Sequence, residues 1–188
     1  MKNRIIYTLL FLGIISCKAQ TITLKQLSEC QAGLYPCPSY TNAKDTDNLL
    51  EKFVGIWKGT YTDGRTYEFH FTKKNDDGDP GERKWDILIG KMIVKVSNGN
   101  VLYNSLYNND LNSIGGFYFD KDLKKYKLSY TANADCNDGG YIYLSFPDPN
   151  NLNQMKLVFM QDMDIIASCP SGYKTVMPDA KAIMLTKQ

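Results

Sequence analysis

Hydrophobic and polar residues alternate along most of the chain, which is the pattern of half-buried β-strands. The clearest stretch is FVGIWKGTYTDGRTYEFHF at residues 53–71. Its first half places Trp57 and Tyr61 on one side of an extended segment, and Asp63-Gly64 supplies a turn before a second alternating run. This stretch therefore predicts a β-hairpin.

Further strands are predicted from the same alternation at residues 85–96, 101–107, 114–120, 125–132, 139–146, 155–160 and 180–186. Asn98-Gly99 separates the first two of these and favours a tight hairpin turn. About nine strands in sequential order, joined mainly by short turns, predict an all-β fold built as an antiparallel up-and-down meander. Such a meander hides its edges by curling into a barrel, although a curled sandwich of two packed sheets satisfies the same pattern.

The start of the chain has the features of a secretory signal peptide, with basic Lys2 and Arg4 before an apolar run. The residues that follow, Ile14-Ile15-Ser16-Cys17, resemble the lipobox of bacterial lipoproteins. This resemblance implies cleavage before Cys17 and attachment of several hydrocarbon tails to that residue, enough for stable anchoring to a membrane. The alternative is a plain secretory signal cut near Ala19-Gln20, with Cys17 incidental.

The region between the signal peptide and the first hairpin lacks sustained periodicity over residues 18–44. It predicts a tether followed by a disulfide-pinned loop. Asp45-Thr46-Asp47-Asn48 then precede Leu49 and Phe53 as an N-cap signal for a short helix. The expected organisation is a lipoprotein signal peptide (1–16), a lipidated tether with a disulfide loop (17–44) and a single β-barrel domain (45–188).

The charges of the exported protein balance. The chain has 22 basic and 20 acidic side chains, and removal of the signal peptide takes away two basic residues, Lys2 and Arg4, and no acidic ones. Nucleic-acid binding relies on clustered lysine and arginine, so no nucleic-acid partner is predicted. Attachment to a membrane would come from the N-terminal lipid and not from a basic patch.

Four cysteines follow Cys17, and an even number in an exported protein indicates two disulfides. Three pairings are possible. We favour Cys30 with Cys37, which closes a small loop containing Pro36, and Cys136 with Cys169, which joins two late loops. A zinc site is the alternative, but none of the four cysteines lies in a CxxC pair and the chain has a single histidine.

No constellation of residues predicts an enzyme. His70 is the only histidine, and the alternation of YEFHF places it on one face with Glu68, so an outward, solvated histidine is expected. No serine lies on a nucleophile elbow and no carboxylate pair can be singled out. The catalytic prediction is therefore that there are no catalytic residues.

An acidic loop at residues 73–84 invites a calcium interpretation, because Asp76, Asp77 and Asp79 crowd around Gly78. The loop lacks the glutamate that completes an EF-hand, and charged glycine-rich loops are common because they are solvated. We predict neither a metal site nor a cofactor.

Tyrosines are concentrated in the predicted strands, and several lie on faces expected to point inward. A barrel with Trp57 at its floor and tyrosines along its wall would suit a small amphipathic or hydrophobic ligand. The tentative ligand-binding residues are Trp57, Tyr103, Tyr126, Tyr130, Tyr141 and Tyr143. Alternatively, these rings fill the core and their hydroxyls reach the rim.

The start of the meander carries a family resemblance. A short helix followed by Gly55-Ile56-Trp57 resembles the GxW opening of the lipocalin and calycin group. The fuller pattern of a lipobox, FVGIWKGTY and DILIGKMIVKVSNGNVLYNSL is similar to an uncharacterised family of small Gram-negative bacterial lipoproteins, which share the tryptophan strand and the hairpin at residues 90–99. The resemblance implies a lipocalin-like barrel in the cell envelope and brings no assigned activity.

These patterns together predict a lipid-anchored outer-membrane protein, on the periplasmic face, with a lipocalin-like β-barrel. Its expected role is non-enzymatic binding of a small hydrophobic ligand. The alternative is a protein-interaction or inhibitor module with a filled core, which works through exposed loops such as residues 73–84 and whose protein partner is unknown.

Overall fold

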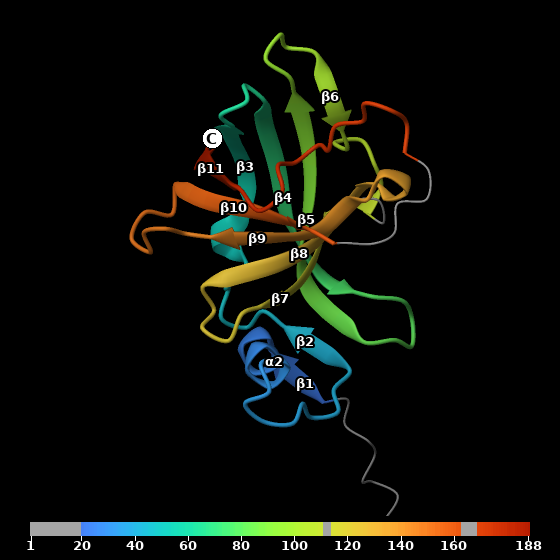
Figure 1. The fold of residues 1–188 in the computed structure, drawn as a ribbon. Helices are drawn as coiled ribbons and strands as arrows, with labels where there is room; N and C mark the ends of the chain where they lie inside the picture. Colours follow the sequence, from blue (N-terminus) through green and yellow to red (C-terminus); the bar gives the residue numbers. More distant parts are fainter. Residues whose placement is uncertain (1–19, 111–113, 163–168) are drawn as a thin grey trace, which may run out of the picture.

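The computed structural model of the protein describes residues 20–110, 114–162 and 169–188. Within these residues, eight antiparallel strands pair into a closed barrel (Figure 1). In chain order they are β3 (Gly55–Thr60), β4 (Thr66–Asp77), β5 (Lys84–Lys95), β7 (Ile114–Phe119), β8 (Lys125–Asn133), β9 (Asp138–Ser145), β10 (Gln154–Gln161) and β11 (Ala182–Lys187). The ring closes because β11 pairs with β3 and β7 pairs with β5. The predicted all-β, up-and-down barrel is confirmed, whereas the signal peptide and Cys17 lie outside the described residues.

Tight turns at the predicted positions join the first strands. Gly64 has φ +85° between β3 and β4, where the Tyr61 N–H donates to the Arg65 carbonyl at 2.8 Å. Gly99 has φ +87° between β5 and β6 (Val101–Asn104). Glycine is favoured at both turns because it has no Cβ to clash in the left-handed region. β6 pairs with the part of β5 that lies beyond the contact with β7.

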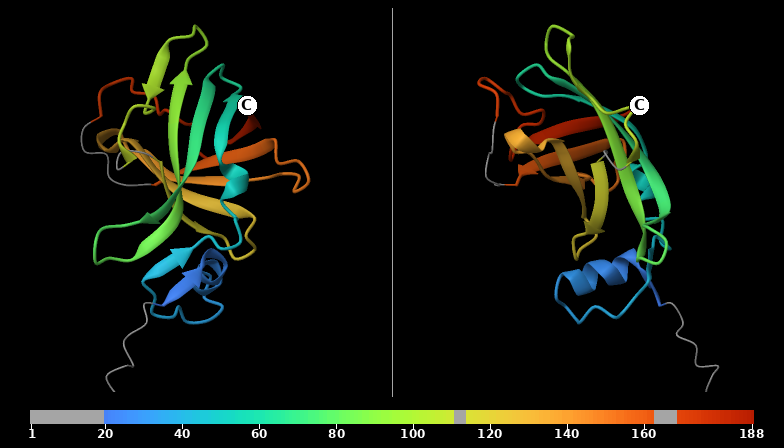
Figure 2. Two further views of the ribbon diagram at one scale, coloured as in Figure 1. Left: turned by 180° about the vertical axis from the view of Figure 1, so that it is seen from behind. Right: turned by 90° about the vertical axis from the view of Figure 1, so that its right-hand side faces the viewer.

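The segment predicted as a tether followed by a disulfide loop has the disulfide loop, but it also has regular secondary structure from Thr21 onward, which the prediction lacked. It forms β1 (Thr21–Thr23), α2 (Leu24–Gln31) and β2 (Asn42–Lys44), which lie together at one end of the barrel (Figure 2). β1 runs parallel to β2, and β2 runs parallel to β5, so the two strands extend the barrel sheet. No helix among the described residues is long and apolar enough to cross a bilayer.

Helix α2 begins with a capping box. The Thr23 hydroxyl accepts the N–H of Gln26 at 3.0 Å, and the Gln26 side chain accepts the N–H of Thr23 at 2.9 Å. Leu24 and Leu27 are buried and fix the helix against the rest of the fold. The helix is missing from the sequence prediction because these two leucines are its main apolar contacts and polar residues surround them.

The helix predicted after Asp45 is reduced to a single 3-10 turn, η1 (Glu51–Phe53). Asp45 does accept backbone N–H groups, as an N-cap would, from Leu49 at 2.7 Å and Leu50 at 3.1 Å. These bonds close a turn that ends in the 3-10 helix, so the chain enters β3 without a full α-helical turn.

Side chains from all eight strands meet inside the barrel. Rings of Tyr67, Phe69 and Phe71 stack along β4, with centroids 6.2 and 5.7 Å apart. Trp57 is fully buried and its Nε1 donates to the carbonyl of Phe53 at 2.8 Å, so η1 closes one end of the barrel over the indole.

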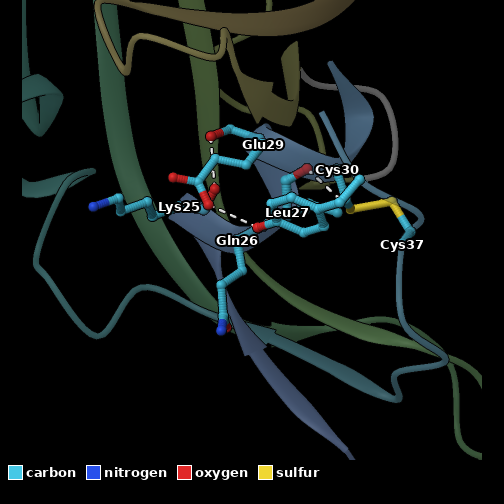
Figure 3. Close-up of a disulfide and its surroundings, with 8 residues drawn as sticks. Lys25, Gln26, Leu27, Glu29, Cys30 and Cys37 are labelled. Carbon is cyan, nitrogen blue, oxygen red and sulfur yellow. Dashed lines mark hydrogen bonds between the residues drawn. A yellow bond between two sulfur atoms is a disulfide. The ribbon is translucent and has the colours of Figure 1, made fainter. Parts of the chain in front are cut away.

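Both favoured disulfide pairings are confirmed. Cys30, near the end of α2, is bonded to Cys37 in the following loop, as Figure 3 shows. Cys136, in the turn η3 (Ala134–Cys136) between β8 and β9, is bonded to Cys169. The second bond ties the β8–β9 turn to the chain that leads into β11.

Candidate functional site

The six residues predicted to bind a ligand do not share one space. Trp57, Tyr126 and Tyr130 are buried inside the barrel, and Tyr103 of β6 is half-buried with its ring edge-on to Tyr130 at 6.4 Å. These four residues extend from the end that η1 closes to the opposite end of the barrel.

Tyr141 and Tyr143 lie on the outer surface, so the prediction that they line the interior is wrong. The inward residues of β9 are Ile142 and Leu144, and both have 0% of their surface exposed. Apolar residues occupy both faces of this strand, so its alternation could not show which face is inside. The aliphatic side chains pack in the core, and the phenols keep their hydroxyls in water.

The interior of the barrel is filled. Side chains from opposite walls, among them Phe69 of β4, Leu128 of β8 and Leu157 of β10, have no accessible surface. A cavity wide enough for a water molecule would give its lining accessible surface, so these side chains pack against one another.

A polar cluster closes the end of the barrel opposite η1. Asp138 of β9 is fully buried, and its Oδ2 accepts the Tyr173 hydroxyl and the Val176 N–H, each at 2.8 Å. Burial raises the pKa of the Asp138 carboxyl, although these two hydrogen bonds oppose that effect. Asp138 Oδ1 and the Tyr130 hydroxyl are buried without a hydrogen-bond partner among the described residues.

The segment containing Tyr173 and Val176 crosses this end of the barrel. The Tyr67 hydroxyl donates to the Val176 carbonyl at 3.1 Å, and the Arg65 guanidinium donates to the carbonyls of Thr175 and Val176 at 2.7 and 2.8 Å. Met177 has no exposed surface. This end is therefore packed and hydrogen-bonded, like the interior.

A groove of about 510 Å³ lies on the outside of the barrel, over strands β7 to β10. Its lining combines three lysines with aromatic, aliphatic and small polar side chains. The lining residues are Tyr118, Asp120, Lys125, Lys127, Tyr143, Ser145, Lys156, Val158 and Met160. We call this groove, together with the neighbouring side chains of Phe117, Tyr141 and Met184, the lysine–tyrosine face.

The pairing register explains how these residues meet. Lys127 of β8 lies opposite Tyr143 of β9, which lies opposite Val158 of β10. In the next row, Ser145 has Lys125 on one side and Lys156 on the other. The lysines of β8 and β10 therefore flank a trough that runs along β9.

A register shift in β7 adds two rings to the edge of the trough. It falls between Gly116 and Tyr118, so Phe117 and Tyr118 both point outward. The Lys127 Nζ lies 3.5 Å from the ring centroid of Tyr141 and 5.6 Å from that of Tyr118. Aromatic rings thus hold the Lys127 ammonium in place.

The lysines of the trough have no acidic partner. Among the described residues, no carboxylate lies within ion-pair distance of Lys125, Lys127 or Lys156. Asp120, the acidic residue of the lining, accepts the backbone N–H groups of Lys124 and Lys125 at 2.8 and 3.0 Å. One oxygen of its carboxylate, Oδ1, is therefore occupied by the β7–β8 turn.

Large apolar side chains are exposed around the trough. Phe117 is 45% exposed, Met160 42% and Met184 48%. Apolar surface gathered on one face of a barrel, together with unpaired charge, is a feature of binding surfaces.

The single histidine lies on another wall of the barrel. His70 of β4 points outward, as predicted, and its Nε2 donates to Glu68 at 2.6 Å, while Lys58 contacts the same carboxylate at 3.0 Å. Hydrogen bonds from His70 and Lys58 hold the pKa of the Glu68 carboxyl below its usual value.

The acidic loop is shorter than predicted, because β4 continues to Asp77 and β5 begins at Lys84. Asp76 is paired with Lys44, and Asp77 is paired with Lys74. Over the described ranges, no group of three or more histidine, cysteine, aspartate or glutamate side chains could hold a metal ion.

Sequence reasoning missed the three lysines of the trough. Lys125 and Lys127 alternate with Tyr126 and Leu128, and this alternation predicts an ordinary solvated face. The signal that could have pointed to them is the shared outward parity with Tyr143, but only the register brings Lys156 opposite them.

Comparison with known proteins identifies the family of the chain. No curated protein and no solved structure gives a significant match. Residues 1–185 match the sequence pattern of a family described as a family of unknown function (DUF6705). Because the match covers nearly the whole length, the chain belongs to this family of unknown function.

Proposed function

We propose that this protein is a lipid-anchored, non-enzymatic interaction module of the cell envelope, and that it binds a protein partner on the lysine–tyrosine face. One observation carries the proposal: three lysines without a carboxylate partner flank an apolar trough on the outside of the barrel. A purely solvated face gains nothing from exposed Phe117, Met160 and Met184 beside unpaired lysines.

The filled interior favours a protein partner over a small ligand inside the barrel. A ligand inside the barrel would have to displace side chains such as Phe69 and Leu157, which have no accessible surface. Displacement of a packed aromatic or leucine side chain costs several kcal/mol, by roughly the amount of a large-to-small core substitution. A partner on the outer trough displaces only water.

The anchor is supported by the sequence. Cys17 follows Ile14-Ile15-Ser16 in the arrangement of a lipobox, and the preceding residues have the composition of a signal peptide. The proposed location is the periplasmic face of the outer membrane. Replacement of Cys17 by serine is expected to release the exported protein from the membrane fraction into the soluble fraction. Unchanged fractionation of the variant would refute the anchor.

The proposal includes no catalytic step. The trough offers ammonium groups, phenols, one serine hydroxyl and the carboxylate of Asp120, which accepts hydrogen bonds from its own turn, while the single histidine lies on β4 in a pair with Glu68. A nucleophile such as the serine hydroxyl would need a general base such as the histidine beside it, and these two groups lie on different walls of the barrel.

The partner surface can be tested by photo-crosslinking in intact cells. A photoreactive residue in place of Tyr143 or Met160 is expected to give discrete crosslinked products, and replacement of the three trough lysines by glutamine is expected to abolish them. The same residue in place of exposed Thr60 or Thr72, on β3 and β4, is the matched control. Equal crosslinking from both sets of positions, or no product from either, would contradict the proposed function.

A further inference from the structure

We propose that the partner segment bound on the lysine–tyrosine face is an extended, acidic polypeptide in which apolar side chains alternate with carboxylates. This inference rests on the proposed function and adds the chemistry and conformation of the partner.

Charge gives the first argument. No carboxylate of the described chain is paired with Lys125, Lys127 or Lys156, and the ammonium group of Lys127 contacts only aromatic rings. A carboxylate from outside can bind these ammonium groups without breaking an internal ion pair. Because the balance of basic and acidic residues elsewhere gives no long-range attraction, this local excess of lysine would select an acidic segment.

Spacing gives the second argument. Lys125 and Lys127 are two residues apart on β8, so their Cα atoms are roughly 6.8 Å apart, which is also the repeat between alternate residues of an extended chain. Lys156 is two strands away, across Ser145, so its Cα is roughly 9.6 Å from that of Lys125 and the two sides of the trough are separated by that distance. One extended chain fits between sides at that separation.

The floor of the trough gives the third argument. Tyr143 of β9 lies between Lys127 of β8 and Val158 of β10, and Tyr143 and Val158 are both half-buried. A segment that lies along β9 points every second side chain down onto this apolar floor and the intervening side chains away from it. Lysine carries its charge on a four-carbon stem, so the flanking ammonium groups can rise to carboxylates on the upper side.

The remaining lining residues fit a polypeptide as well. Met160 is unbranched and can adapt to different apolar side chains, and tyrosine and methionine are enriched at protein interfaces. The site is hollow and its lysines stand on its two sides. Docking to a lipid surface would instead be expected to use protruding apolar side chains, so an anionic membrane is the competing outcome of the test.

The test uses a labelled five-residue peptide, Glu-Phe-Glu-Leu-Glu, and the exported full chain with Cys17→Ser, which keeps both partners in solution. Fluorescence anisotropy measures the affinity. We expect binding that weakens with added salt, and a dissociation constant at least tenfold higher for the Lys125→Gln, Lys127→Gln, Lys156→Gln variant.

A matched control carries the same change in net charge at exposed lysines outside the trough: Lys25→Gln, Lys95→Gln and Lys181→Gln. This control variant is expected to bind the peptide as the parent does. An equal loss in both variants would show attraction to net charge alone and would overturn the inference.

Two further peptides separate the elements of the inference. Lysine in place of each glutamate should abolish binding, and serine in place of phenylalanine and leucine should weaken it at least fivefold.

If an uncharged apolar peptide binds the trough equally well, the acidic partner is wrong while the interaction module stands. No binding of the acidic peptide, or lysine-dependent binding to anionic phospholipid vesicles in its place, overturns the inference. Failure of the crosslinking experiment would instead remove the proposed function.

Discussion

Two outer walls of the same barrel use lysine in different ways. On β3 to β5, Lys58 binds Glu68 at 3.0 Å and Lys91 binds Asp110 at 3.5 Å. On β8 to β10, Lys125 and Lys156 have no acidic partner within the described part of the chain. The walls differ in their acidic residues: β4 carries Glu68, Asp76 and Asp77, whereas the single acidic residue of β8 to β10 is Asp138, which is buried. The acidic partners, and not the number of lysines, therefore distinguish a wall with internal ion pairs from one suited to a partner.

The groove on each wall agrees with this difference. The wall of β3 to β5 carries a shallow hollow of about 380 Å³ in which Lys58 faces Glu68, and Lys95 at its edge is exposed. The trough on the other wall is larger, and its floor is aromatic and aliphatic. On the first wall, lysine charges are paired with carboxylates of the same chain. On the second wall, a partner would supply the carboxylates.

Ser145→Glu would convert the second wall into a copy of the first, and it carries the largest expected effect. The new carboxylate would lie between Lys125 and Lys156, which flank position 145 in the register. We expect at least a tenfold loss of crosslinked partner and of peptide affinity, together with a small gain in the free energy of unfolding, about 0.2–1 kcal/mol. Photo-crosslinking and urea denaturation measure these two effects. Retention of partner binding in a folded variant would break the comparison.

Asp138→Asn asks whether an unpaired charge inside the barrel behaves differently from one outside. The pKa of the Asp138 carboxyl is raised by burial, so ionisation of this carboxyl lowers the free energy of unfolding. This loss is absent below about pH 3.8 and grows as pH rises through the folded pKa. At neutral pH we expect the asparagine variant to gain about 1 kcal/mol in the free energy of unfolding, because a neutral amide replaces a buried charge.

Urea denaturation of both proteins across the acid range checks this sign. The two stabilities should converge at low pH and separate as pH rises. A variant that is less stable at neutral pH would contradict this prediction. It would show that the hydrogen bonds of the Asp138 carboxylate outweigh the cost of burying its charge.

Glu68→Gln removes the shared acceptor of the paired wall and carries the smallest effect. The pKa of Glu68 is lowered by His70 and Lys58, so its stabilisation is present above about pH 4.5 and is lost as pH falls through the folded pKa. We expect a loss of about 0.5 kcal/mol at neutral pH, because the pair is partly solvated. Photo-crosslinking of the partner from position 143 should be unchanged. A change in it would show that the two walls are energetically coupled.

The barrel could be predicted because most of its strands alternate with a period of two and are bounded by turn residues. The face of β9 could not be predicted, since Tyr141 and Ile142 are both apolar enough to be buried and only packing against the opposite wall selects one set. The folded N-terminal segment was missed for a related reason. Its capping box at Thr23 and Gln26 is local, but the surface that buries Leu27 comes from distant residues.

The candidate site was beyond sequence reasoning for a geometric reason. Lys125 and Lys156 are far apart in the chain, and they meet across Ser145 only through the register of three strands. β8 alone indicates a wet face, and neither β9 nor β10 alone shows a group of lysines. The absence of a carboxylate between the lysines is a property of the assembled sheet.

The folded strand β1 changes how far the protein could reach from a membrane. A tether through residue 44 would have allowed the barrel to move over distances larger than its own diameter. With Thr21 already in a strand, only three residues separate Cys17 from the folded domain, and even a fully extended chain spans about 14 Å over the four Cα–Cα steps from Cys17 to Thr21. On the proposed anchor, the end of the barrel that carries β1, α2 and β2 would be held beside the lipid headgroups. The protein would then meet its partner at the membrane surface, within a radius set by this short connection.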